Sequence, residues 1–297
     1  MTHNATVHTA SENHRGIVLM VVAMAAFTFN DACMKSVNAD LPLFQAIFLR
    51  GVLTTTALGI IAWRAGALPI RIPRRDWKLV IWRALGEVAS TVTFLLALRE
   101  MPLANLSAIM QSLPLAVTLA AAVVLRSPVG WRRLAAILIG FCGVILIVRP
   151  GTEGFDHWAL LGIASVGFVV LRDLATRGLS PAVPSAGVAL LAATSVTLTA
   201  ALAVPFDGWE PVTPQAWAKI GAAAGFLIVG YLTVVMTMRV GDIAIVAPFR
   251  YTALVFALVL GWLVFDQFPD EWTLLGAVII MATGVYTFHR ERLAARR

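Results

Sequence analysis

Residues 131–149 read WRRLAAILIGFCGVILIVR, and residues 272–290 read WTLLGAVIIMATGVYTFHR. A shift of 141 residues superimposes the tryptophan, the Gly-Val pair and the closing arginine of the two stretches: Trp131 on Trp272, Gly143-Val144 on Gly284-Val285, and Arg149 on Arg290. Leucine and alanine coincide easily in apolar sequence, so these rarer matches carry the comparison. They indicate that the two stretches are related copies.

The duplication extends outward from these stretches. With a shift of 139, three more positions coincide: Ala108 with Ala247, Leu115 with Leu254, and Leu119 with Leu258. Nearer the N-terminus, each half has an acid and a base four residues apart: Asp31 with Lys35, and Asp173 with Arg177. We therefore expect two related halves, residues 16–150 and 151–290. A membrane chain of this kind is most often a transporter with its substrate site between the halves.

Composition places the chain in a membrane. Hydrophobic residues make up 59% of it and charged residues only 13%, which excludes an ordinary soluble domain. The apolar residues form continuous runs, each near the ~20 residues that cross a bilayer as a helix. The runs are 16–36, 42–63, 79–98, 104–125, 131–149, 157–175, 183–204, 216–238, 243–265 and 271–289. We predict an all-α integral membrane protein with ten transmembrane helices.

The positive charges predict its orientation. If the amino terminus is cytoplasmic, the outer connections hold few lysines and arginines, namely Lys35, Arg99, Arg149 and Lys219. Most of the others fall on the inner side, so the positive-inside rule predicts that both termini are cytoplasmic. Five spans in each half is an odd number, so the second half must be inverted relative to the first. Inverted repeats are expected to support alternating access.

The remaining segments predict no further chemistry. Residues 1–15 form a polar stretch that we expect to be a disordered cytoplasmic tail and not a signal peptide, and residues 291–297 a basic cytoplasmic tail. Cys33 and Cys142 lie in separate apolar runs, which favours neither a disulfide nor a metal site. We expect no cofactor, no metal ion and no nucleic-acid partner. A monomer is expected, with a homodimer as the alternative.

Charged residues inside apolar runs are the main candidates for function, because each costs at least ~2.5–3.5 kcal/mol to insert without a partner or water. Arg83 and Glu87 lie four residues apart, close enough to pair on one helix face. Glu87 falls near the bilayer midplane. It could contact substrate or merely neutralise Arg83, and the sequence favours neither interpretation.

Gln111 and Arg250 occupy matched positions in the two halves. Together an amide and a guanidinium could hold the carboxylate of a substrate, since the planar fork of arginine fits a carboxylate. Alternatively, Arg250 caps backbone carbonyls or pairs with a buried acid. Tyr231 and Tyr251 are further candidates for substrate binding, because each hydroxyl needs a partner in hydrocarbon.

Two matched dipeptides, Asn30-Asp31 and Arg172-Asp173, are expected to act as inverted gates or as charge pairs. In the structural interpretation, Asp31 pairs with Lys35 or with Arg50, and Asp173 pairs with its neighbour Arg172 or with Arg177.

Prolines and glycines predict where the helices bend and touch. Pro114 and Pro248 interrupt the fourth and ninth runs, where each removes a backbone donor and could act as a hinge. Gly221 and Gly225 suggest a face for close helix packing. Gly140 and Gly143 suggest another, within the chain or between subunits.

Several stretches resemble the drug/metabolite transporter superfamily, in its ten-helix EamA branch. They are Phe94-Leu-Leu-Ala-Leu-Arg-Glu-Met-Pro-Leu-Ala-Asn, Leu113-Pro-Leu and Gly140-Phe-Cys-Gly-Val-Ile-Leu-Ile-Val-Arg-Pro-Gly in the first half, then Ala247-Pro-Phe-Arg-Tyr, Leu260-Gly-Trp-Leu-Val-Phe and Leu275-Gly-Ala in the second, with Arg50 in the second helix. The chain departs from the family at its usual Gly-Glu pairs, which are replaced by Leu125-Arg-Ser-Pro and Phe265-Asp-Gln. The resemblance implies helices around a central cavity in a bacterial inner membrane.

The resulting expectation is a secondary exporter of small metabolites, foremost amino acids, including aromatic and other hydrophobic ones, as in exporters of the YddG type. The alternative substrates are drug-like cations and sugar- or nucleotide-type metabolites. An enzyme is not expected, because the chain has no His-Glu-x-x-His, Gly-x-Ser-x-Gly or nucleotide-binding Gly-x4-Gly-Lys motif. A channel or scaffold would leave the buried charges without a purpose.

Overall fold

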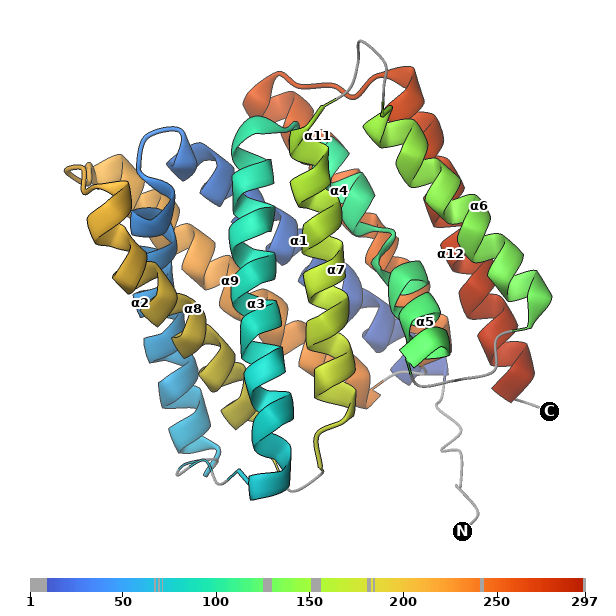
Figure 1. Ribbon diagram of the computed structural model, residues 1–297, viewed down its shortest axis with the longest axis horizontal. Helices are drawn as coiled ribbons and strands as arrows, with labels where there is room; N and C mark the ends of the chain where they lie inside the picture. The colour runs from blue at the N-terminus through green and yellow to red at the C-terminus, as the bar shows by residue number, and fades with distance from the viewer. Residues whose placement is uncertain are drawn as a thin grey trace.

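The computed structural model describes residues 10–66, 68, 70, 72–124, 130–150, 156–180, 183, 185–240 and 243–295 (Figure 1). Every regular element in these ranges is a helix. The α-helices are α1 Ala10–Asn38, α2 Leu43–Arg64, α3 Trp77–Glu100, α4 Leu103–Met110, α5 Leu113–Val124, α6 Trp131–Val148, α7 Trp158–Arg177, α8 Ser185–Asp207, α9 Pro214–Val240, α10 Ile243–Val246, α11 Thr252–Phe265 and α12 Glu271–Ala295. Two 3-10 helices, η1 Arg74–Asp76 and η2 Ala247–Tyr251, complete the set.

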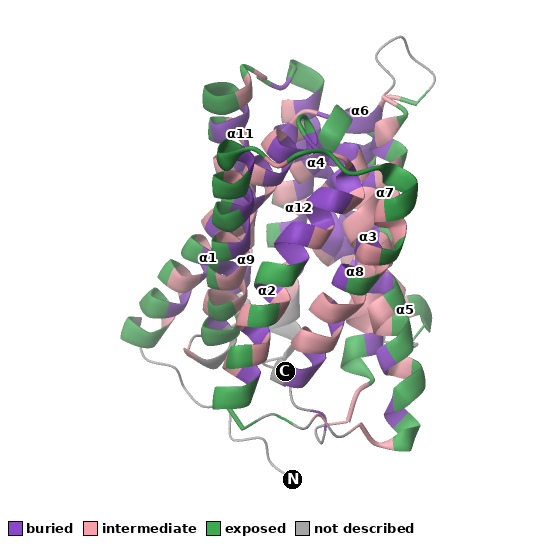
Figure 2. Ribbon diagram, turned by 90° about the vertical axis from the view of Figure 1, so that its left-hand side faces the viewer, coloured by how far each residue is buried: buried purple, intermediate pink, exposed green. Residues whose placement is uncertain are grey.

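Ten helical segments of the described chain are long and apolar enough to cross a membrane, which confirms the predicted number. The fourth span consists of α4 and α5, and the ninth of η2 and α11. A helix satisfies its own backbone hydrogen bonds, which is required where no water is present. Large apolar side chains remain exposed, among them Leu202 at 76% and Trp63 at 70%, and in a membrane they would face lipid. Figure 2 colours the exposed residues green along the ribbon.

The helices pack in pairs that repeat between the two halves. The first span of each half packs on the third span of the other half: α1 packs on α9, and α7 packs on α3. The pairs α2 with α8 and α6 with α12 each join equivalent spans. The two five-helix units are thus interleaved, and every large helix-helix contact joins one unit to the other.

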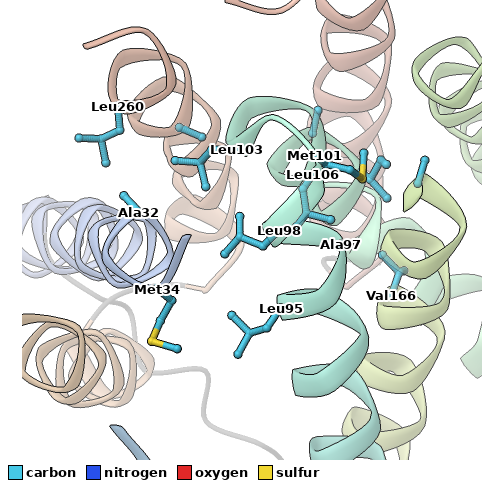
Figure 3. Close-up of a cluster of buried hydrophobic side chains, with 14 of the residues drawn as sticks. Ala32, Met34, Leu95, Ala97, Leu98, Met101, Leu103, Leu106, Val166 and Leu260 are labelled. Atoms are coloured by element: carbon cyan, nitrogen blue, oxygen red, sulfur yellow. The ribbon is translucent and has the colours of Figure 1, made fainter. Parts of the chain in front are cut away.

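Helix α1 begins, and helix α12 ends, at the same end of the bundle, which we call the terminal face (Figure 1). We call the other end the opposite face. A large apolar core lies toward the opposite face and includes Met34, Leu95, Leu98 and Leu106, which come from α1, α3 and α4 (Figure 3).

Both ends of the chain are more helical than expected. Residues 10–15 belong to α1, whereas we expected a disordered tail through residue 15. Residues 291–295 likewise continue α12, beyond the end of the last expected run at residue 289 and into the expected basic tail. Hydropathy marks the part of a helix that lies in hydrocarbon, and these polar turns extend past it.

The fourth and ninth spans are interrupted at corresponding places. Between α4 and α5, Gln111 and Ser112 form a turn in which the Ser112 N–H bonds the Ile109 carbonyl, 3.0 Å away. In the ninth span the five residues of η2 replace regular α-helix, with Pro248 near their start. The proline at 114 removes the donor that would have continued the helix across the first break. The expectation of matched interruptions therefore agrees with the structure, while a hinge function for these prolines remains a proposal.

Glycines bring α6 and α12 together, but not the helices around Gly221. A Cβ on Gly143 would lie 2.7 Å from the Gly276 carbonyl oxygen, so these two helix backbones touch. Gly140 faces Leu115 and Thr283 of the same chain. Among the described residues, nothing lies within 4 Å of a Cβ built on Gly221 or Gly225, so the close helix packing that we expected at these two glycines is wrong for this part of the chain.

Candidate functional site

The centre of the bundle holds an ion-pair cluster that crosses between the halves. Glu87, on α3, accepts from Arg83 one turn earlier at 3.4 Å, and from Arg172 on α7 at 3.4 Å. Arg172 also donates through Nε to the Asp173 carboxylate at 3.0 Å. The Glu87 side chain is only 10% exposed. Thus the expected Arg83–Glu87 and Arg172–Asp173 pairs are both present, and Glu87 joins them into one group.

A second polar group lies on α1 and α2. The Arg50 guanidinium donates to the Asn30 side-chain oxygen at 3.1 Å, and the Asn30 amide donates to Asp31 at 2.9 Å. Arg50 and Asn30 are buried. Arg50 is therefore linked to Asp31 through Asn30, close to the expected arrangement in which Arg50 is a partner for Asp31.

Lys35 does not pair with Asp31, so that alternative is wrong. Its ammonium group is buried and donates to the backbone oxygens of Leu98 at 2.8 Å and Met101 at 2.6 Å. These carbonyls stand at the end of α3, where the helix cannot satisfy its last acceptors. Lys35 therefore holds α1 against the end of α3 at the opposite face.

Tyr231 on α9 is close enough to both polar groups to interact electrostatically with them. Its hydroxyl interacts electrostatically with Glu87, Arg172 and Arg83 of one group and with Arg50 of the other. Its ring meets Phe27 edge-on, with 5.7 Å between ring centroids. Tyr231 thus connects an apolar surface with the charged cluster, as a residue that contacts an amphipathic substrate would.

Glu87 and Tyr231 occupy corresponding positions in the two halves of the structure. Glycine precedes both residues, and a Cβ on Gly86 would lie 2.9 Å from the Phe168 carbonyl oxygen of α7. In the other half, a Cβ on Gly230 would lie 2.7 Å from the Phe27 ring of α1. Each half therefore has a glycine where its third span crosses the first span of the other half, and Glu87 or Tyr231 follows that glycine. Sequence comparison alone missed this match, because one small residue beside two unlike ones gives almost no signal.

Gln111 and Arg250 meet where the two interrupted spans come together. The Gln111 side-chain amide donates to the Arg250 backbone oxygen at 3.3 Å. Among the described residues, the Arg250 guanidinium has no ion pair and no side-chain hydrogen bond, although it interacts electrostatically with Asp173 and Arg172. The two residues that we expected to share a substrate are thus adjacent. The contact between them joins the Gln111 side chain to the Arg250 backbone and leaves out the guanidinium.

The expected gating and substrate residues do not all belong to this cluster. The ring of Tyr251 contacts Gly284 of α12, and its buried hydroxyl has no hydrogen-bond partner among the described residues. Pro248 and Tyr251 instead line a small hollow of about 250 Å³ beside Met281. No three His, Cys, Asp or Glu side chains of the described residues are grouped closely enough to hold a metal ion.

The charges of the cluster do not cancel. Four arginines, Arg50, Arg83, Arg172 and Arg250, face three carboxylates, those of Asp31, Glu87 and Asp173. The side chains of Arg172 and Asp173 keep 26% and 35% exposure, so this part of the cluster is accessible to water. An excess positive charge beside an accessible space favours an anionic group as the missing partner.

A bundle of ten spans, made of two interleaved halves with charged residues and interrupted helices between them, is the architecture of a secondary transporter. The comparison with protein families assigns it more narrowly. The model of the EamA-like transporter family matches residues 14–149 and again residues 156–288, so the chain belongs to this family. The two matches coincide with the two halves found in the sequence, and they confirm that the protein is a transporter and not an enzyme.

Characterised relatives are similar over almost the whole chain. The pseudopaline exporter CntI of Pseudomonas aeruginosa is 25% identical over 267 residues, which cover 90% of this chain and 93% of that protein. The S-adenosylmethionine uptake transporter of Rickettsia felis is 25% identical over 293 residues, 95% of each. A riboflavin transporter of Rhizobium johnstonii is 26% identical over 298 residues, 95% of this chain and 93% of that one.

A solved crystal structure shares the fold. It superimposes with a TM-score of 0.63 at 20% identity and covers 95% of this chain and 99% of the other. The likeness supports the arrangement of the ten spans.

Proposed function

We propose that this transporter carries small metabolites that bear a carboxylate, foremost amino acids, out of the cell across a bacterial inner membrane. The observation that carries the proposal is the Arg250 guanidinium, which lies within the bundle without an ion pair. Arg250 is half-buried. A substrate carboxylate would form the bidentate ion pair that its guanidinium lacks among the described residues. Tyr231 and Phe27 would provide an apolar surface for the remainder of an aromatic or aliphatic amino acid.

A cationic drug fits this site less well. Such a substrate needs an acidic side chain that is free to face it, and Glu87 is held by two arginines. The relatives named for riboflavin and for S-adenosylmethionine support a small-metabolite substrate, and they keep the nucleotide-type alternative in the test below.

The proposed mechanism is alternating access between the two faces. At the opposite face, three links join the start of α2 to the end of α8 and to the connection that follows it. The Phe44 N–H donates to Asp207 at 2.7 Å, and the Gln45 side chain both donates to the Glu210 carbonyl at 2.7 Å and accepts from the Glu210 N–H at 2.9 Å. At the terminal face, the Ser180 hydroxyl donates to the buried Asp76. These sites are related by the duplication, so we propose that they close the two faces in turn.

Transport into liposomes tests the proposal. Purified protein is reconstituted, and counterflow is measured with labelled phenylalanine, threonine, lysine, S-adenosylmethionine, riboflavin and a quaternary-ammonium drug, with and without a proton gradient. Amino acid exchange is expected, and the Arg250→Ala variant should lose at least about tenfold in initial rate, the scale of one charged hydrogen bond of ~1.5–3 kcal/mol. Arg250→Lys should recover only part of it, because lysine lacks the fork.

The matched control is Arg99→Ala, which removes a half-exposed arginine at the end of α3 and should not change the rate. If the drug moves and the amino acids do not, and Glu87→Gln abolishes its transport, the carboxylate assignment is wrong. If riboflavin is the only compound transported, the nucleotide-type alternative replaces the carboxylate assignment.

A further inference from the structure

A hollow of about 490 Å³ lies between α6 and α12, away from the central cluster, and is open to the surroundings. Its lining includes Trp131, Arg132, Ala136, Ile139, Ala282 and Tyr286. The volume falls in the ~300–1,000 Å³ range of small-molecule sites. Trp131 is 74% exposed and Ile139 54%, so the hollow forms part of the outer surface of the bundle. None of the residues that line it belongs to the charged cluster.

The hollow follows from the way in which the two helices cross. Toward the opposite face the helix backbones touch at Gly143 and Gly276. Toward the terminal face the facing positions carry alanines, among them Ala135, Ala136 and Ala282, which leave a groove between the diverging helices. Its walls are mostly apolar. A groove of this shape on a surface within the membrane suits an acyl chain.

The terminal end of the groove is positive. Helix α6 begins here, at Trp131, and Gly130 before it has no side chain that could cap it. The Arg133 N–H already donates to the Gly130 carbonyl at 2.9 Å, so only the N–H groups of Trp131 and Arg132 come before the first backbone hydrogen bond. Arg132 is exposed and lies over the Trp131 ring, 5.4 Å from its centroid. Arg290 follows Tyr286 by one turn of α12, on the same helix face. A helix N-terminus with adjacent arginines favours a phosphate group.

Arg133 is directed elsewhere, which leaves Arg132 as the arginine that lines the groove. The Arg133 guanidinium donates to Thr118 of α5 at 3.2 Å, on the inner side of α6. Trp131 and Tyr286 complete the rim of the hollow. Tryptophan and tyrosine are enriched at the depth of lipid headgroups, where one part of the ring is apolar and another is wet.

We propose that this groove binds one anionic phospholipid of the leaflet at the terminal face. The phosphate would lie near Arg132 and the first N–H groups of α6, and one acyl chain would lie over Ala136 and Ile139. A second copy of the protein is a poorer occupant. A two-fold interface over this groove would place Arg132 of each copy on the same small patch, and like charges repel there.

Native mass spectrometry of the delipidated full-length protein tests the proposal. The protein is titrated with phosphatidylglycerol or with phosphatidylcholine of the same acyl chains. We expect the first phosphatidylglycerol to bind about tenfold more tightly than phosphatidylcholine, the effect of roughly one charged contact. Arg132→Glu should abolish this preference. Ala282→Leu, which fills the groove, should weaken the first binding event for both lipids.

The control is Arg64→Glu, which makes the same change of charge at the end of α2, at the terminal face but far from α6 (Figure 1). This variant should keep the lipid preference. Equal binding of the two lipids, or the same loss in Arg64→Glu, would overturn the proposal, as would a dimer that Ala282→Leu abolishes. If Ala282→Leu does not fold, Arg132→Glu decides alone, because it alters an exposed side chain. Lipid binding is measured without transport, so its result is independent of the substrate assignment.

Discussion

The carboxylate of Glu87 on α3 and the guanidinium of Arg172 on α7 lie 3.4 Å apart, and this ion pair joins the first half of the chain to the second inside the membrane. Arg83 contacts the other oxygen of the same carboxylate. One acid therefore bridges two arginines from different halves. The pair lies directly beside the helix crossing at Gly86, so packing and charge hold the two halves together at one level.

Glu87→Gln should lower the stability of the protein by about 1–3 kcal/mol, because it leaves two mostly buried arginines without their shared partner. The midpoint of thermal unfolding in detergent should fall by several degrees, as followed by tryptophan fluorescence. Glu100→Gln is the control, since its ion pair with Arg99 is 43–46% exposed and should contribute little. An unchanged midpoint for Glu87→Gln would show that the pair does not hold the halves together.

Gly86→Ala should destabilise the same crossing. The added methyl group would lie 2.9 Å from the Phe168 carbonyl oxygen and 3.0 Å from the Arg172 nitrogen, both backbone atoms that cannot turn aside. A loss of about 1–3 kcal/mol is expected, as in other overpacked sites. Gly221→Ala has open space around the new methyl group and should keep or slightly raise the unfolding midpoint. Equal midpoints for the two variants would contradict the close approach of α3 and α7.

Gln45→Ala should loosen the opposite face. The Gln45 side chain is fully buried and makes two hydrogen bonds with the Glu210 backbone, and alanine makes neither. In a Cys142→Ser background, the half-buried Cys33 near the end of α1 should react with a maleimide several times faster. Asp40→Asn removes only the exposed ion pair with Lys219 and should leave the rate unchanged. If Cys33 reacts equally fast in Gln45→Ala and in the parent protein, Gln45 is not part of a gate.

Asp270 makes the stability depend on pH. Burial alone would raise the pKa of its carboxyl, but hydrogen bonds from the Thr273 N–H and the Arg149 guanidinium outweigh burial and hold this pKa below its ordinary value. A lowered pKa means that the stabilisation is present above the unfolded-state pKa of ~4 and is lost as the pH falls through the folded-state pKa.

Asp270→Ala removes the cap at the start of α12, where the Asp270 carboxylate accepts from Thr273 at 2.8 Å. We expect a loss of about 1 kcal/mol at pH 7. The difference from the parent protein should persist down to about pH 4 and shrink below it. Asp266→Asn, at the other end of the same loop, is the control, because asparagine tolerates the left-handed backbone of this position. A difference between Asp270→Ala and the parent that grows with acidification would contradict the lowered pKa.

The fold could be predicted because a membrane imposes one dominant rule. Apolar runs of the right length must be helices, so ten spans follow from hydropathy alone, and the duplication adds their grouping in two halves. The ends could not be predicted, because the polar turns at residues 10–15 and 291–295 continue helices outside hydrocarbon. The interruptions were visible as prolines, and they lie within three residues of Gln111 and Arg250.

The site could be predicted only where local spacing decides. Arg83 and Glu87 share a helix face, so their contact follows from a spacing of four residues. The same rule gave the wrong partner for Lys35, because the carbonyls at the end of α3 are long-range neighbours that need a donor more than Asp31 does. Gly86 and Gly230 were overlooked for a related reason, since a close crossing is visible only when the second helix is present.

The two halves carry unlike residues where they meet. Glu87 in one half corresponds to Tyr231 in the other, and Gln111 corresponds to Arg250. A perfectly duplicated chain would have two conformations of equal energy, one open to each face of the membrane. In the proposed cycle these four side chains remove that equality. We therefore expect one of the two orientations to be more populated when no substrate is bound, and we expect an exchange of the four residues between the halves to change which face is open in that state.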